Sequence, residues 1–139
     1  MSDFITAGGS VFGALQADKA AEDNAQMAEL NAFLAIKQSK EDARRIGVLA
    51  SKVISAQRAA YGASGVTLEG SPLDVIEESA ANAELDILTA KQQGKAAAFG
   101  LSQQAEQYRA EGRTAKTLGF INAGASAFSG AEKIAFGGG

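Results

Sequence analysis

The sequence contains no cysteine, histidine or tryptophan, and it has a single proline. Without cysteine the chain has no disulfide and no thiolate metal site, and without histidine it lacks the commonest metal ligand and proton shuttle. The 13 basic residues are scattered and outnumbered by 16 acidic ones, which argues against specific binding to duplex nucleic acid. Only 6% of the residues are aromatic, so few bulky side chains are present to fill a hydrophobic core within one chain. We therefore expect part of the stability to come from contacts with other chains.

No group of side chains in the sequence has the composition of a catalytic site. The acidic residues Asp74, Glu77 and Glu78 fit the start of a helix, and Glu84 and Asp86 fit a solvated helix face. The glycine-rich segments lack the Lys-Ser/Thr step of a phosphate-binding loop. We therefore expect no enzyme, no cofactor and no metal site. The first residues also lack the basic segment of a secretory signal, so we expect no export by the general route.

The two ends of the chain are apolar and rich in small residues. Residues 4–16 and 117–131 carry no charged side chain, and both stretches are shorter than the roughly 20 residues of a lone membrane-spanning helix. Small residues recur there at every fourth position, which on a helix forms a smooth stripe for close approach of another helix. These helix-packing stripes are Gly9, Gly13, Ala17 and Ala21 at one end, and Gly119, Ala123, Ala127 and Ala131 at the other.

The centre of the chain has the composition of long helices. Residues 17–61 contain no proline and are dominated by good helix formers, which predicts one long helix. Met27, Leu30 and Leu34 recur at steps of three and four residues and predict a contact zone. Residues 37–45 are polar around most of the helix circumference, so we expect them to be solvated between two contact zones.

A break in the helical pattern falls at residues 62–71. Gly62 is expected to end the first helix in a left-handed conformation, Ser71 to cap the second, and Pro72 to occupy its first position. The second helix is predicted over residues 72–112. Its buried stripe is predicted to contain Leu73, Ile76, Ala80, Ala83 and Ile87, with Phe99 and Tyr108 as later anchors.

The expected fold is all-α: a long antiparallel helical hairpin, because a loop of about 10 residues is enough to reverse the chain. Residues 1–16 and 113–139 form Gly/Ala-rich apolar ends, helical or flexible, and the protein is expected to be oligomeric. Small-residue stripes also occur in ordinary close-packed bundles. However, here they continue into uncharged ends that carry aromatic side chains, which favours an oligomer or a membrane-active protein. These membrane or partner anchors are Phe4, Phe12, Phe120 and Phe128.

The residues around the break resemble a motif of the internal virion proteins of short-tailed bacteriophages, the small DNA-ejection proteins packed near the portal. The helix-turn motif consists of Arg58, Tyr61, Gly62, Ser64, Gly65, Val66, Gly70, Ser71 and Pro72, followed by the segment 83–87. The close similarity covers about 30 residues, and the rest is similar in composition. The pieces of the motif also fit a well-made helix-loop-helix, so its specificity is intermediate.

The resemblance implies a protein stored in the head near the portal, released ahead of the DNA, and reassembled as a channel across the host envelope. The smallest family member is associated with the outer membrane. The implied partners are other copies in a homo-oligomeric ring, the portal or other internal virion proteins, the host membrane after ejection, and DNA only as non-specific cargo. The alternative is a purely structural virion adaptor or core component at the portal without a membrane role.

Overall fold

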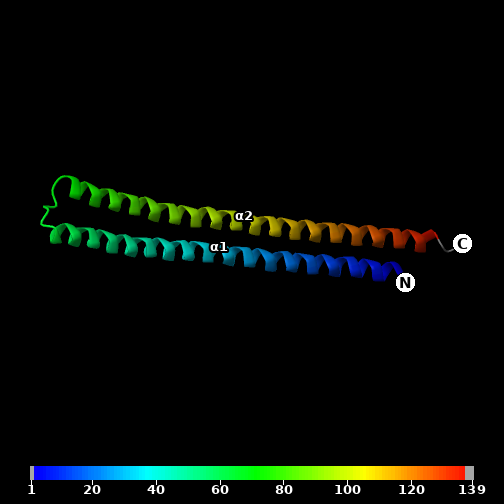
Figure 1. Ribbon diagram of the computed structural model, residues 1–139. Coiled ribbons are helices and arrows are strands. Elements are labelled where there is room, and N and C mark those ends of the chain that lie inside the picture. Colours follow the sequence, from blue (N-terminus) through cyan, green and yellow to red (C-terminus); the bar gives the residue numbers. More distant parts are fainter. Residues whose placement is uncertain (1, 137–139) are drawn as a thin grey trace. The chain divides into compact units, whose positions relative to one another are not determined.

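Two long helices and one turn make up the computed structural model, which describes the backbone of residues 2–136 and the side chains of residues 8–132. Helix α1 is Ser2–Ala63 and helix α2 is Ser71–Phe136. The described backbone contains no strand, and the two helices run in opposite directions as a hairpin (Figure 1). The predicted all-α helical hairpin is therefore confirmed. Both helices extend past the predicted bounds at residues 17 and 112, so the described parts of the two ends are helical.

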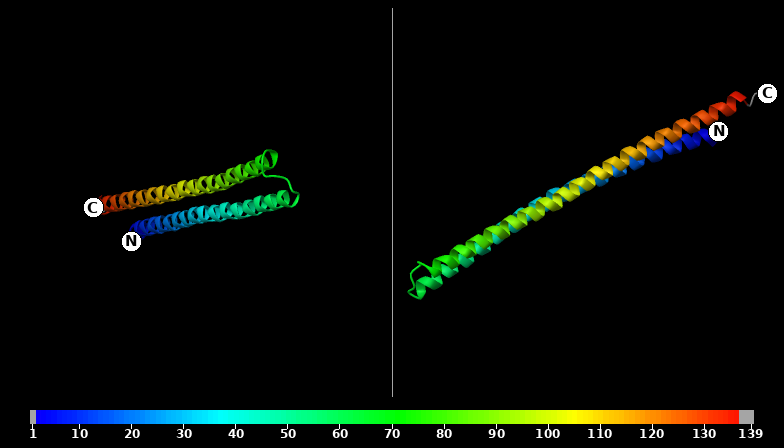
Figure 2. Two further views of the ribbon diagram at one scale, coloured as in Figure 1. Left: turned by 90° about the vertical axis from the view of Figure 1, so that its left-hand side faces the viewer. Right: turned by 90° about the horizontal axis from the view of Figure 1, so that it is seen from above.

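The chain divides into two compact units. Unit 1 combines Met1–Leu30 with Leu101–Gly139, and unit 2 is the continuous segment Asn31–Gly100. Within each unit a segment of α1 lies beside a segment of α2, as the two views in Figure 2 show. Each unit is thus a two-helix structure whose stability depends on one seam.

Unit 1 has a seam of alanine and glycine. Ala14, Ala25, Ala28 and Ala105 are buried, and Tyr108 packs against the last three of them. A Cβ atom added at Gly119 would collide with the Ala14 methyl group, and one added at Gly112 would lie 2.8 Å from that of Ala21. The two backbones are therefore so close that α2 accommodates only glycine at these two positions.

Small residues in this seam recur at every seventh position. In α1 they are Ala14, Ala21 and Ala28, and in α2 they are Ala105, Gly112 and Gly119. A seven-residue repeat keeps one face of each helix turned toward its partner, as in a coiled coil. The small side chains bring the two helices closer than leucine would.

Unit 2, described by itself, has the same kind of seam. Ala32, Ala43, Ile76 and Ala98 are buried, and a Cβ atom at Gly94 would collide with the Ser39 side chain. The expected solvated middle at residues 37–45 is therefore wrong, because Ser39 and Ala43 place a small-residue face of this polar segment against α2. Further along, the Gln57 amide donates a hydrogen bond of 3.1 Å to the Ser79 hydroxyl.

The bulky apolar side chains behave differently from the prediction. Met27, Leu30 and Leu34 are exposed, so the contact zone predicted for them is wrong within this chain. Phe99 is exposed as well, whereas Tyr108 is an anchor as expected. In the second helix the predicted stripe is largely correct, with Ile76 buried and Ala80, Ala83 and Ile87 half-buried, although Leu73 is exposed.

Candidate assembly surface

The residues of the predicted helix-turn motif lie in the turn and in the adjoining ends of α1 and α2. Gly65 and Gly70 have φ angles of +73° and +72°, and they are the only described glycines with positive φ. The prediction for Gly62 is therefore wrong, because α1 continues to Ala63 and Gly65 takes the left-handed position. The Gly65 amide donates to the Gly62 carbonyl, and the Ser64 hydroxyl donates to the Tyr61 carbonyl at 2.9 Å, so two carbonyls at the helix end have partners.

The start of α2 is shifted by one residue from its predicted position. The Asp74 amide donates to the Gly70 carbonyl at 3.1 Å, so Gly70 is the capping residue and Ser71 the first helical one. Pro72 follows in the first turn, where its missing amide hydrogen costs nothing. Arg58 and Val66 are exposed, and Tyr61 and Pro72 are half-buried. The motif therefore builds the turn and leaves Arg58 and Val66 accessible.

The structure distributes the two predicted packing stripes over several faces. Gly119 lies in the seam against Ala14, and Ala21 and Ala123 are half-buried. The remaining members, Gly9, Gly13, Ala17, Ala127 and Ala131, are exposed. Each four-residue step advances roughly 40° beyond a full helical turn, so residues at this spacing wind around the helix. The seam repeats every seven residues and stays on one face, so the stripe and the seam share only a few positions. The exposed members are available to another chain.

The aromatic anchors point outward. Phe128 is 83% exposed, Phe12 68% and Phe120 50%. Phe4 lies outside the residues whose side chains are described. Ile121 and Leu118 add exposed apolar surface to α2 beside Phe120. Unit 1 thus presents bulky apolar side chains at the described parts of both uncharged ends, and large exposed apolar patches mark interaction surfaces.

An ion-pair cluster crosses the seam of unit 1. The Arg109 guanidinium donates to Glu29 at 2.7 Å and to Glu22 at 3.4 Å, and within α2 it lies 3.2 Å from Glu106. The hydrogen bond from Arg109 lowers the pKa of Glu29, and the hydrogen bonds to Glu29 and Glu22 raise the pKa of Arg109. Lys116 adds a second pair across the seam, 3.3 Å from Asp18.

Packing contacts and charge pairs are the interactions that the described side chains of unit 1 form. In the part of the chain with described side chains, no group of three or more carboxylates is placed to hold a metal ion. Over the same described residues, neither helix has a stretch long and apolar enough to cross a membrane. Comparison with protein-family models, with curated proteins and with solved structures found no match to this chain.

Several residues that hold the helices together were not predicted from the sequence. Gly94 and Gly112 are seam residues, and Arg109 with its two glutamates spans the seam. A count of small residues at seven-residue intervals would have found the seam. The partners of Arg109 become apparent only once the register of the two helices is known.

Proposed function

We propose that this protein is an internal virion protein of the short-tailed phage type, stored near the portal and released to form part of a DNA-translocation conduit across the host envelope. The similarity of the turn motif, from Arg58 to Pro72, supports this family. The proposed partners are further copies of the chain in a ring, portal or other internal virion proteins, and the host membrane after ejection.

The observation that carries the proposal is the separation of small and large apolar side chains. Alanine and glycine fill the seams, while most bulky apolar residues are exposed. They include Phe12, Met27, Leu30, Phe33, Leu49, Val53, Leu85, Phe99, Phe120 and Phe128. Full burial of a leucine or phenylalanine side chain contributes about 1.5–3 kcal/mol of stabilising free energy, and within the hairpin alone most of these side chains stay exposed to water. Packing against neighbouring subunits or insertion into lipid would bury these side chains.

The same separation suits a protein that leaves a virion and reassembles. A seam of small side chains gives each segment of the hairpin little hydrophobic burial to lose when the helices separate. No disulfide ties the helices together, since the sequence has no cysteine. The released chain would then bury its outward side chains in a new assembly.

Two measurements on the full-length protein test the proposal. Light scattering reports the size of the assembly, and dye-loaded liposomes report membrane permeabilisation. Leakage together with a defined oligomer supports the conduit. A defined oligomer without leakage would instead favour the structural adaptor at the portal, and a monomer without leakage would contradict both.

Gly13→Leu sharpens the assembly measurement. Nothing lies within 4 Å of a Cβ atom at Gly13, so the substitution is expected to leave the chain's own fold intact. A smaller oligomer in this variant would place the exposed part of the stripe in a contact between subunits. Ala127→Leu is the corresponding variant in α2. Normal assembly of both variants would show that the exposed parts of the stripes do not lie in a subunit interface.

A further inference from the structure

An open apolar groove lies on the flank of α2 in unit 2. It has a volume of about 560 Å³ and is lined by Ala81, Glu84, Leu85, Ile87, Leu88 and Lys91. Leu85 and Leu88 are 60% and 52% exposed, although both are apolar. All of these lining residues belong to one helix and fall within three turns. The groove is therefore a helix flank on which a second helix can pack.

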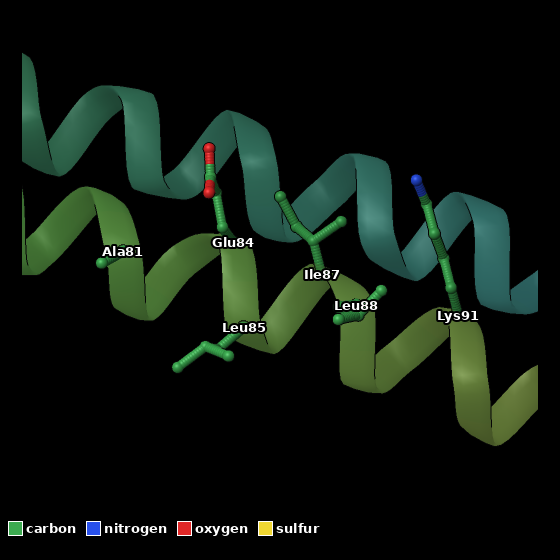
Figure 3. A pocket seen from close by; sticks show the side chains of 6 residues that line it. All are labelled: Ala81, Glu84, Leu85, Ile87, Leu88 and Lys91. Atoms are coloured by element: carbon green, nitrogen blue, oxygen red, sulfur yellow. The ribbon is translucent and has the colours of Figure 1, made fainter.

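One reason for the groove is the small residue opposite it in α1. A Cβ atom at Gly47 would be 3.5 Å from the Ile87 methyl group, so Gly47 of α1 contributes no side chain there. In Figure 3, Glu84, Ile87 and Lys91 extend toward α1, whereas Leu85 points away from it. The flank beside Ile87 and Leu88 consequently stays uncovered within unit 2.

The two charged residues of the groove have opposite signs and lie about two helical turns apart along it. Glu84 and Lys91 are seven residues apart, which is about 10 Å along a helix, and both are exposed. Neither forms an ion pair with another side chain in the described part of the chain. The midpoint between them falls between Ile87 and Leu88, the apolar residues at the centre of the groove. A two-fold rotation about this midpoint would place Glu84 of one copy opposite Lys91 of the other.

We propose that this groove is a contact between two copies of the chain, in which the α2 flanks pack antiparallel around a two-fold axis near Ile87 and Leu88. Glu84 then pairs with Lys91 of the partner subunit, and Lys91 with Glu84 of the partner subunit. A two-fold contact uses the same patch on both subunits and therefore requires a self-complementary pattern. The groove has that pattern, with apolar residues at its centre and one charge of each sign at equal distances from it. This contact rests on the self-assembly proposed above.

Charge reversal on the full-length protein tests the contact. In Glu84→Lys both interchain pairs become repulsive, and the same holds for Lys91→Glu. In each single variant the dimer dissociation constant, measured by sedimentation equilibrium at low salt, should rise roughly tenfold. The double variant, which carries both substitutions, restores two attractive pairs and should dimerise like the original chain.

Mixing the two single variants gives the most discriminating result. A Glu84→Lys chain beside a Lys91→Glu chain has two attractive pairs, so native mass spectrometry should detect mainly the mixed dimer. A role of these residues inside one chain would not produce this rescue. Asp86→Lys is the matched control, because it reverses an exposed charge on the same helix outside the groove, and its dimerisation should stay near that of the original chain.

Three outcomes would overturn the contact: undiminished dimerisation of the single variants, absence of the mixed dimer, or a strictly monomeric original chain. Liposome leakage separates this proposal from the proposed function. Single variants that lose the dimer and still cause leakage would support the contact and show that leakage does not depend on it. A normal charge-reversal pattern in a protein that never causes leakage would support the contact and contradict the conduit.

Discussion

The Arg109 guanidinium of α2 lies 2.7 Å from the Glu29 carboxylate of α1 and also reaches Glu22, one heptad away. Registers that differ by seven residues keep many of the same small-residue contacts in this seam. Arg109 supplies the discrimination, because a shift by one heptad would replace one of its two glutamates by Leu15 or Ile36. The charge pairs therefore specify the alignment that the alanine and glycine contacts of unit 1 leave open.

Removal of the Arg109 charge should destabilise unit 1. Arg109→Gln loses both carboxylate partners across the seam, so we expect a lower Tm by circular dichroism. Arg113→Gln is the matched control, since Arg113 is exposed and forms no ion pair among the described residues. Equal melting of the two variants would show that the charge pairs of Arg109 do not contribute to stability.

The stability of unit 1 should fall in acid. The hydrogen bond from Arg109 lowers the pKa of Glu29 in the folded chain, so its contribution is fully present above the unfolded value of about 4.3. It is lost as the pH falls from there through the lower folded pKa. Glu29→Gln should therefore flatten the pH dependence of Tm below about pH 5. An unchanged acid profile in this variant would remove Glu29 from the effect.

The sequence predicts the elements of this fold better than the contacts between them. The proline-free centre predicts long helices, and the glycines before Pro72 predict the turn. The seam of unit 1 and the α1 side of the seam in unit 2 were not predicted, because the contact zone at Met27, Leu30 and Leu34 assumes that large apolar residues are buried. Alanine satisfies helix propensity on any face, so its presence at Ala25 or Ala43 does not identify a buried position. The bulky apolar side chains point outward because the two helices lie too close together for large side chains to fit in the seam.

Two glycines of α2 should respond oppositely to alanine substitution. Gly119→Ala places a methyl group against Ala14, and such overpacking costs about 1–3 kcal/mol. Gly124 has nothing within 4 Å of an added Cβ atom, so Gly124→Ala should stabilise the helix by up to about 1 kcal/mol. Thermal or urea denaturation measures both changes. The seam geometry of unit 1 would be contradicted if Gly119→Ala stabilised the chain as well.

The turn should tolerate substitution at Gly62 but not at Gly65 or Gly70. A side chain at positive φ costs roughly 1–2 kcal/mol, so Gly65→Ala and Gly70→Ala should each lower the free energy of unfolding by about that amount. Gly62 lies in α1 and a Cβ atom there meets nothing within 4 Å. Gly62→Ala is therefore expected to be neutral or stabilising. Destabilisation of the same size at Gly62 would contradict the assignment of the helix end to Ala63.

If the uncharged ends are the membrane-active elements, their exposed phenylalanines should control liposome leakage. Transfer of one phenylalanine side chain out of water contributes about 1.5–3 kcal/mol, so Phe12→Ser or Phe128→Ser should require roughly tenfold more protein for the same leakage. Both side chains are exposed, and the helical circular dichroism should not change. Phe33→Ser is the matched control, because Phe33 is 62% exposed but lies in the charged centre of the chain, where burial in lipid is expensive. Equal losses in all three variants would assign leakage to apolar exposure in general, and the ends would no longer be its source.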